Sequence, residues 1–284
     1  MLDIAIVRTI LYTVFALIAF AFNSILCRLA LRGEEADAAG FTAVRLASGA
    51  VALIVISYFF SKKKGTLSSG SWPSAFFLFA YAICFSFAYL GLTAGTGALI
   101  LFGAVQMTMI AVAIIKGERP PALEWLGLAV AVGGLVYLVF PGLASPPLYS
   151  SLLMAAAGAA WGFYTLRGKG SGDPLANTTG NFIRSVPMIA VAAIPFFSKI
   201  HLSNRGIMLA VLSGAVTSGI GYTVWYAALK FHTSTRAAVL QLAVPVIAAA
   251  AGVLLLDEVA TVRLAIAAAL ILGGIGLTIM GRRA

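Results

Sequence analysis

Charged residues are what this sequence has least of: they make up 10% of its 284 residues, whereas hydrophobic residues make up 61%. A soluble domain carries about 25% charged residues, enough to cover its surface. With a mean hydropathy of +1.03, this chain lacks the polar side chains that a water-exposed surface requires. The composition therefore excludes a soluble domain and predicts an all-α membrane protein embedded in a lipid bilayer.

Carboxylates and histidines are missing from the interiors of the long apolar runs. All nine acidic residues lie between those runs or at their ends, and His201 and His232 lie in connecting segments. An enzyme site inside the membrane would need a convergent set of nucleophiles, acids or metal ligands, so we expect no enzymatic activity, no metal and no cofactor. The same absence argues against a buried proton relay and against tight binding of dications. It favours a facilitator or weakly coupled carrier for neutral or zwitterionic solutes.

Cysteine is scarce as well, with only Cys27 and Cys84, and neither lies in a CxxC or metal-binding spacing. Both fall inside apolar runs, which predicts packing residues rather than a disulfide or a zinc site. The net charge of +10 comes from short basic blocks, such as Lys62–Lys64, at the ends of apolar runs. Such blocks are typical of the cytoplasmic loops of membrane proteins, so we expect no nucleic-acid partner.

Long apolar runs, in contrast, are abundant. A helix needs about 20 mostly apolar residues to cross the hydrocarbon core of a bilayer. Ten runs approach this length: 7–29, 40–60, 72–92, 94–116, 122–140, 148–167, 175–197, 204–228, 235–256 and 261–281. Lys and Arg number twelve in one set of alternate connectors and five in the other, which predicts that both the N- and C-termini lie in the cytoplasm.

The sequence repeats landmarks at a spacing of 139 or 140 residues. Four pairs share this offset: Arg28 and Arg167, Arg45 and Arg184, Glu118 and Glu258, and the Gly-Gly pairs 133–134 and 273–274. Four matches in corresponding runs predict two copies of a five-helix unit, 1–142 and 143–284. Because five is odd, the second copy is expected to be inverted in the membrane. Two inverted repeats around a central cavity are a common basis of alternating access in secondary transporters.

Several stretches resemble the EamA repeat of the drug/metabolite transporter (DMT) superfamily, among them "AFAFNSILCRLAL", "IIKGERPPALEWLGLAVAVGG" and "LLLDEVATVRLAIAAALILGGIG". The similarity extends over essentially the whole chain in two copies and is greatest to YddG-type exporters of aromatic amino acids. It implies that spans 1, 3, 4, 6, 8 and 9 surround a central cavity, with spans 5 and 10 outside it. The first span departs from the family's frequent Trp-Gly-Ser-Asn, because this chain has Phe20-Ala21-Phe22-Asn23, so that only Asn23 carries over.

The resemblance and the repeat together predict a secondary transporter. It would export aromatic or large neutral amino acids, or related small metabolites, across a bacterial inner membrane. The alternative is an exporter of apolar drugs or organic cations. The expected partners are a small-molecule substrate and the lipid bilayer, and the prediction is compatible with a monomer.

Polar and aromatic residues away from the span ends are the candidates for lining the cavity. The amides of Asn23, Gln106 and Gln241 fit equally well as interhelical hydrogen-bonding groups or as cavity lining. Three aromatic pairs each share one helix face: Tyr81 and Phe85, Trp161 and Tyr164, and Tyr222 and Trp225. They could fill the core or belong to the interfacial belt, but together they suit an apolar, π-rich cavity for an aromatic solute. The candidate substrate-binding residues are Phe20, Asn23, Tyr81, Phe85, Leu99, Gln106, Trp161, Tyr164, Tyr222, Trp225 and Gln241.

Arg45 and Arg184 occupy matching positions near the starts of the second and seventh spans. Each could recognise a substrate carboxylate, or could snorkel and pair with helix-end carbonyls near the interface; the position favours the second interpretation. Pro187 and Pro245 fall inside spans, where a missing backbone hydrogen bond predicts a kink or hinge. The Gly-Gly pairs are expected to permit close helix packing.

Overall fold

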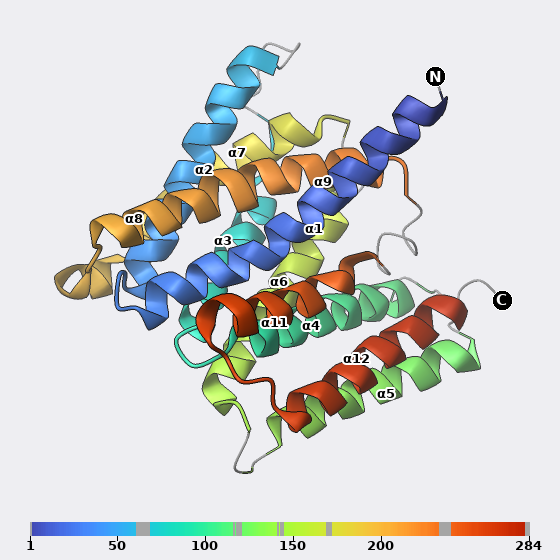
Figure 1. Cartoon of the computed structure of the whole chain (residues 1–284). Helices are drawn as coiled ribbons and strands as arrows, with labels where there is room; N and C mark the ends of the chain where they lie inside the picture. The colour runs from blue at the N-terminus through green and yellow to red at the C-terminus, as the bar shows by residue number, and fades with distance from the viewer. Residues whose placement is uncertain are drawn as a thin grey trace.

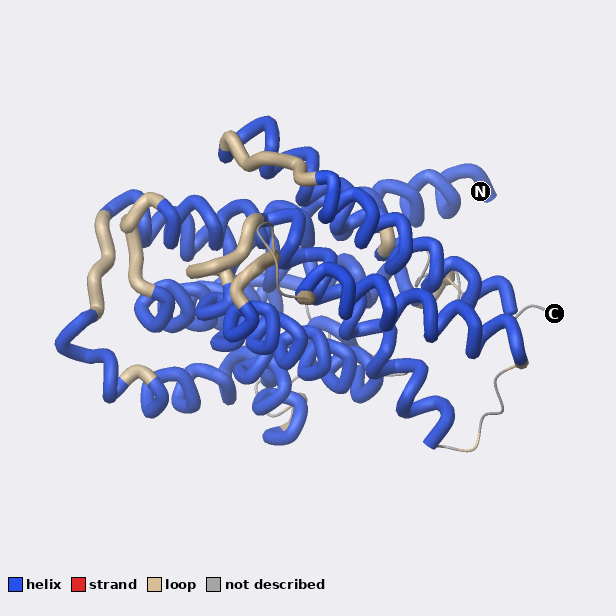
Figure 2. The backbone as a smooth tube through the Cα atoms, turned by 90° about the horizontal axis from the view of Figure 1, so that it is seen from below, coloured by secondary structure: helices blue, strands red, loops and turns tan. Residues whose placement is uncertain are grey.

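A computed structural model describes residues 2–60, 69–115, 117, 121–140, 142, 145–168, 172–232 and 240–281. Within these ranges every regular element is a helix. Many of the helices run broadly along one direction, with connections gathered at the two ends (Figure 1, Figure 2). Among the described residues, the sole β feature is a single antiparallel bridge between Ala36 and Leu202. The prediction of an all-α chain is therefore confirmed.

Helices occupy each of the ten predicted ranges. The first five ranges hold α1 (Leu2–Arg32), α2 (Ala38–Phe60), α3 (Trp72–Ala88), α4 (Ala94–Ile115) and α5 (Ala122–Val139). The next three hold α6 (Leu148–Gly168), α7 (Pro174–Ala192) with the 3₁₀-helix η2 (Ile194–Lys199), and the continuous segment α8 (Asn204–Val211), η3 (Leu212–Ile220) and α9 (Gly221–Leu229). The last two hold α11 (Ala243–Leu256) and α12 (Val262–Gly281). Residues 235–239 of the ninth predicted range lie outside the described residues.

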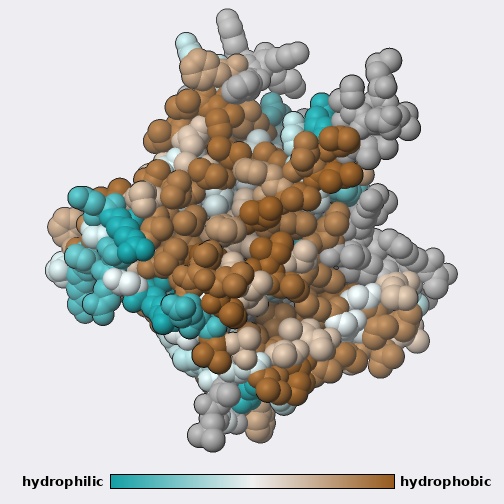
Figure 3. Space-filling view, viewed as in Figure 1, coloured by the Kyte–Doolittle hydropathy of each residue, from teal (hydrophilic) through white to brown (hydrophobic). Residues whose placement is uncertain are grey.

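Five helical segments within the described ranges are long and apolar enough to cross a membrane: Val7–Arg32, Ala38–Phe59, Ala94–Ile115, Ala122–Val139 and Asn204–Leu229. Helices α3, α11 and α12 are apolar but shorter. Apolar side chains also lie on the outside of the bundle, where Ile10, Leu11, Val246 and Leu255 are all more than half exposed. One face is largely hydrophobic, with hydrophilic residues gathered at the end where α8 begins (Figure 3). Such a surface suits contact with lipid.

Helices α5 and α12 form a pair at one edge of the molecule (Figure 1). The other helices build the main bundle, in which α1 packs on η3, α9 and α11. Helix α2 packs on η3 and α7, and α6 packs on α3 and α4. This arrangement agrees with the expectation that the fifth and tenth spans lie outside the central cavity.

One glycine of each Gly-Gly pair lies at the contact between α5 and α12. A Cβ atom added at Gly134 would lie 2.8 Å from the Cβ of Leu270. A Cβ atom added at Gly274 would lie 2.6 Å from the carbonyl oxygen of Gly127. Both positions are too tight for a side chain, so the predicted close packing is confirmed at Gly134 and Gly274.

We expect Gly274→Ala to lower the unfolding temperature of the detergent-purified protein, because the new methyl group would overlap the backbone of α5. Overpacking of this kind typically costs about 1–3 kcal/mol. The matched control is Gly273→Ala, since nothing lies within 4 Å of a Cβ added at Gly273. Equal unfolding temperatures for the two variants, measured by tryptophan fluorescence, would contradict close packing at Gly274.

The irregular part of the bundle is the eighth span. Residues Leu212–Ile220 form a π-helix, η3, where the apolar run predicts a continuous α-helix. A Cβ atom added at Gly214 would lie 2.0 Å from the carbonyl oxygen of Arg45, so the missing side chain lets η3 approach the backbone of α2. Isolated π-turns occur frequently at functional sites.

The two prolines proposed as hinges lie in different settings. Pro187 is inside α7, where its missing N–H interrupts the helical hydrogen bonds. Pro245 lies in the first turn of α11, where N–H groups have no acceptor within the helix. A local kink therefore follows from Pro187 but not from Pro245, and a hinge function of either residue stays a prediction.

Candidate functional site

Aromatic side chains from four helices meet in the interior of the bundle. Phe20 of α1 packs edge-on against Trp161 of α6 and Tyr222 of α9, with ring centroids 6.1 and 5.8 Å apart. The ring centroid of Trp161 lies 4.5 Å from that of Tyr222 and 5.1 Å from that of Tyr81 of α3. Trp225 of α9 also packs edge-on against Phe20, with ring centroids 5.8 Å apart. All five rings are buried, and we call them the aromatic cluster.

Asn23 connects the aromatic cluster to the π-helix. Its Nδ2 donates to the Tyr81 hydroxyl at 3.1 Å. Its Oδ1 accepts from the hydroxyls of Ser213 and Thr217 of η3, at 2.7 and 3.1 Å. Such interhelical bonds satisfy an amide that would otherwise be costly in a dry interior, so Asn23 ties α1 to both α3 and η3.

Arg45 lies beside this network and is only 1% exposed. Its Nη2 donates to the hydroxyls of Tyr81 and Tyr222 at 3.2 and 3.3 Å, and its Nε donates to Ser218 at 3.3 Å. The guanidinium carbon lies 4.9 Å from the centre of the Phe85 ring. The snorkelling interpretation of Arg45 is therefore wrong, because the side chain points into the bundle and reaches no interface.

Arg184, at the matching position of the seventh predicted span, binds backbone carbonyls. Its Nη1 donates to the carbonyl oxygens of Ser69 and Gly180, at 2.5 and 2.9 Å. These acceptors belong to the connection before α3 and to α7 itself. Two arginines at matching sequence positions thus have different surroundings.

A small cavity lies at the centre of these contacts. It has about 10 Å³ of space, which is roughly the room that one water molecule needs. Six of the predicted lining residues surround it, together with two that sequence reasoning missed. The lining residues are Phe20, Asn23, Tyr81, Phe85, Leu101, Phe102, Trp161 and Tyr222.

The other predicted lining residues lie elsewhere. Leu99 lines a separate apolar cavity of about 380 Å³ between α4, α11 and the start of α12, together with Pro245. Gln106 of α4 and Gln241, just before α11, are buried, and neither lines the central cavity. Tyr164 packs 5.4 Å from Trp161 and lines a third, polar pocket.

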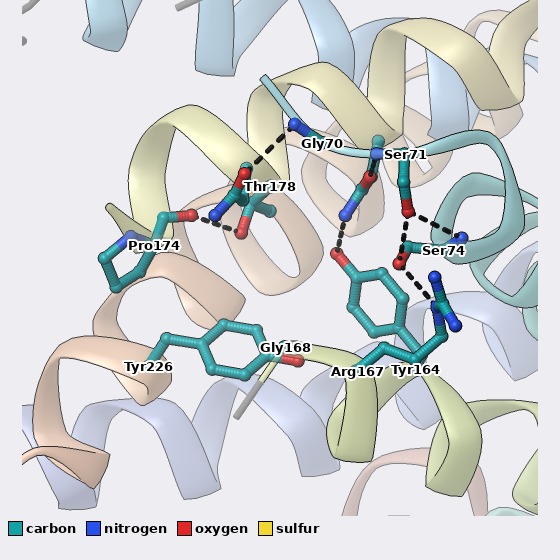
Figure 4. A pocket seen from close by; sticks show the side chains of 11 residues that line it. Gly70, Ser71, Ser74, Tyr164, Arg167, Gly168, Pro174, Thr178 and Tyr226 are labelled. Atoms are coloured by element: carbon teal, nitrogen blue, oxygen red, sulfur yellow. Dashed lines mark hydrogen bonds between the residues drawn. The ribbon is translucent and has the colours of Figure 1, made fainter. Parts of the chain in front are cut away.

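This polar pocket has about 180 Å³ of space and lies between the start of α3, the end of α6, α7 and α9. Tyr164 and Tyr226 extend into it from α6 and α9 (Figure 4). Arg167 also lines it and donates to the Ser74 hydroxyl at 3.1 Å. Asn181 donates to the Tyr164 hydroxyl at 3.4 Å. Because Tyr164 contacts both Trp161 and Tyr226, tyrosine rings separate the polar pocket from the aromatic cluster.

The end of the bundle opposite the polar pocket is held together by a partly buried ion pair. Nε of Arg28 lies 3.2 Å from Oε1 of Glu258, whose side chain is 7% exposed. The other carboxylate oxygen of Glu258 accepts from the backbone N–H of Ala94 at 2.8 Å. Arg28 also donates to the carbonyl oxygen of Tyr89 at 2.9 Å. We call these contacts the ion-paired end, which joins α1, the α3–α4 turn and the α11–α12 connection.

The chain resembles known proteins both in sequence and in fold. The profile of the EamA-like transporter family matches residues 148–280. An uncharacterized protein of Pseudomonas aeruginosa is 48% identical over 275 residues, which cover 97% of this chain and 96% of that protein. An Escherichia coli protein named a probable amino-acid metabolite efflux pump is 27% identical over 221 residues, 72% of this chain and 73% of its own length. A crystal structure of another protein matches with a TM-score of 0.66 at 18% identity, over 96% of this chain and 97% of that one; this last likeness concerns the fold alone.

Proposed function

Because the chain belongs to the EamA-like transporter family, we propose that it exports aromatic or large neutral amino acids, or related small metabolites. The protein would move these solutes across a bacterial inner membrane by alternating access. Membrane transport follows from the family, which is not one of enzymes. The Escherichia coli relative, named for amino-acid metabolite efflux, supports a cargo of that kind.

The observation that carries this proposal is the aromatic cluster beside Asn23 and Arg45. Trp161, Tyr222 and Phe20 offer flat apolar faces to a ring, and Asn23 and Arg45 offer hydrogen-bonding groups next to those faces. Binding sites for small molecules typically combine apolar walls with a few placed polar groups. The combination suits a cargo with an aromatic side chain and a polar head.

Alternating access is proposed from the different states of the two ends. The ion-paired end is closed by Arg28 and Glu258, whereas the other end contains the polar pocket. In the predicted topology, the polar pocket faces the cytoplasm, so this conformation is closed to the outside. The N-terminal end of α1 and the C-terminal end of α12 lie at the same end of the molecule (Figure 1), as an even number of crossings requires. The proposed inverted repeat, 1–142 and 143–284, would supply the second state, open to the other side, by exchanging the conformations of the two halves about a pseudo-two-fold axis in the membrane plane.

The proposal is tested by reconstituting the protein in proteoliposomes and measuring uptake of radiolabelled tryptophan, phenylalanine and an organic cation such as tetraphenylphosphonium. We expect saturable uptake of the two amino acids. Uptake of the organic cation alone would contradict the proposed cargo. Empty liposomes and an unrelated membrane protein of similar size are the controls for leakage.

We further expect tryptophan transport to be independent of a proton gradient. Among the described residues, no aspartate or glutamate lines the central cavity, and the described ion pairs lie at the outer ends of helices. A buried carboxylate is the usual carrier of a coupled proton. A pH difference of about one unit across the vesicle membrane should leave the uptake of labelled tryptophan unchanged. A pH dye trapped inside the vesicles should report no proton movement that accompanies tryptophan. Proton movement in fixed proportion to tryptophan would contradict this expectation.

A further inference from the structure

Arg45 places a positive charge inside the helical bundle, and no carboxylate among the described residues forms an ion pair with it. It lies about 10 Å along α2 from Ala38, at about 1.5 Å per residue. The described ion pairs are Arg28 with Glu258 and Arg205 with Glu35, and neither includes Arg45. An unpaired charge at such a depth is expensive, and evolution usually retains one only where it is compensated or used.

The neighbours of Arg45 compensate its charge only in part. Its three hydrogen-bond acceptors, the hydroxyls of Tyr81, Tyr222 and Ser218, are neutral and lie 3.2–3.3 Å away. The ring centres of Tyr81 and Phe85 lie 5.2 and 4.9 Å from the guanidinium carbon, a favourable but weak cation–π arrangement. Nη1 is buried and has no acceptor among the described residues. One edge of the guanidinium therefore lacks a partner that a carboxylate would supply.

Two of these neighbours also line the central cavity. Tyr81 and Tyr222 each accept a hydrogen bond from Arg45 at the hydroxyl, and both residues line the cavity. The same two rings pack against Trp161. A solute whose ring lies among these aromatic side chains would thus have its polar head within reach of the guanidinium once the tyrosine hydroxyls move aside.

We propose that Arg45 binds the carboxylate of the cargo. The transported class is then aromatic or large apolar carboxylates, amino acids among them, and amines without a carboxylate are excluded. This inference rests on the proposed function and narrows it. A planar guanidinium matches a carboxylate in a two-pronged hydrogen bond, and the buried setting strengthens the attraction. The present cavity of about 10 Å³ is the closed form, so cargo binding requires the aromatic walls to separate.

A purely structural function for Arg45 makes a different prediction. If Arg45 only ties α2 to α3 and α9, its replacement lowers stability and affects all solutes alike. If it binds a carboxylate, replacement changes the ratio between solutes that have the carboxylate and solutes that lack it. Selectivity, rather than activity, is therefore the measurement that separates the two functions.

The first experiment uses the unchanged protein and three solutes that share the indole ring. Tryptophan has both charged groups, 3-indolepropionate keeps only the carboxylate, and tryptamine keeps only the ammonium. Each is tested as a competitor of labelled tryptophan in proteoliposomes and as a stabiliser of the purified protein in thermal unfolding. We expect 3-indolepropionate to compete within about tenfold of tryptophan and tryptamine to be at least about tenfold weaker, the factor that corresponds to loss of one good polar contact. Tryptamine equal to tryptophan in both assays would overturn the inference.

The second experiment compares Arg45→Gln with Arg45→Lys. Arg45→Gln should reduce the preference for tryptophan over tryptamine at least about tenfold, and Arg45→Lys should restore part of it because the charge is kept. Arg184→Gln is the matched control, since Arg184 donates to the backbone carbonyls of Ser69 and Gly180, away from the central cavity, and its selectivity should equal that of the unchanged protein. Unchanged selectivity in Arg45→Gln would assign the residue a structural function alone.

The two assays also separate this inference from the function on which it rests. If 3-indolepropionate stabilises the protein in an Arg45-dependent way but no labelled solute crosses the membrane, transport of this class is refuted and the carboxylate site stands. If tryptophan is transported with equal efficiency by Arg45→Gln and by the unchanged protein, transport stands and the carboxylate site is refuted. If neither binding nor transport occurs with any of the three solutes, both proposals fall.

Discussion

Trp161→Ala should lower the kcat/KM of tryptophan transport at least about tenfold, while the protein still inserts and folds. Trp161 is buried and contacts Tyr81, Tyr222 and Phe20 around the central cavity. Aromatic contacts of this kind each contribute about 0.5–1.5 kcal/mol beyond burial, and a tenfold change corresponds to about 1.4 kcal/mol. Transport is measured in proteoliposomes that contain equal amounts of folded protein, as judged by size-exclusion chromatography.

The matched control for this variant is Phe163→Ala on the same helix. Phe163 is 38% exposed and stacks on Phe77 of α3 away from the cavity, so its loss should affect stability more than transport. Trp161→Phe keeps a ring and should retain part of the activity. Equal losses in Trp161→Ala and Phe163→Ala would show that Trp161 acts through packing alone, contrary to the proposed site.

Glu258→Gln should weaken closure of the ion-paired end. The carboxylate holds both Arg28 and the backbone of Ala94, and a hydrogen bond to a charged partner contributes about 2 kcal/mol. That energy corresponds to about a 30-fold change in the ratio of closed to open molecules. The native thiol of Cys27, fully buried beside Arg28, reports the opening. In a Cys84→Ser background, we expect a membrane-impermeant maleimide to modify Cys27 from that side at least about tenfold faster in Glu258→Gln.

Glu35→Gln is the control for Glu258→Gln. Glu35 lies at the same end and pairs with Arg205, but the two side chains are 25% and 62% exposed. Exposed pairs contribute little, so the labelling rate of Cys27 should hardly change. If Cys27 reacts equally slowly in both variants, Arg28 and Glu258 do not control access from this end.

The sequence predicts the helices and much of the aromatic cluster because both depend on short-range patterns. Long apolar runs set the positions of α1, α2 and α4. Helical spacing places Tyr81 and Phe85 on one face of α3, and these residues do line the cavity. Gly134 and Gly274 were predictable for the same reason, since close packing of helices needs small residues wherever they meet.

The sequence does not predict which face of a helix points to the cavity when apolar residues occur on all of its faces. Helix α4 is apolar and buried on nearly all sides along Ala94–Gln106, so hydropathy could not tell that Leu101 and Phe102 line the cavity and that Leu99 and Gln106 do not. The π-helix η3 packs Gly214 against the backbone of Arg45, a tertiary contact that the sequence does not show. The Ser, Thr and Gly residues of "LSGAVTSGI" were its one local signal.

Charges near helix ends were the other source of error. The position of Arg45 favours snorkelling, and only the packing of α2 against η3 and α3 shows that the side chain is buried instead. The sequence places Glu258 between two apolar runs, yet in the structure its side chain is buried against Arg28 and Ala94. Its repeat counterpart, Glu118, lies outside the described residues.

The central claim is that one site, formed by the aromatic cluster with Asn23 and Arg45, is opened first to one side of the membrane and then to the other. Counterflow tests it most directly. Proteoliposomes preloaded with unlabelled tryptophan and diluted into a trace of labelled tryptophan should accumulate label transiently above equilibrium, because each inward step of the carrier exchanges against an outward step. A channel would let the label rise only to its equilibrium level. An overshoot that disappears in Trp161→Ala is the predicted result, and a monotonic rise in the unchanged protein would contradict alternating access.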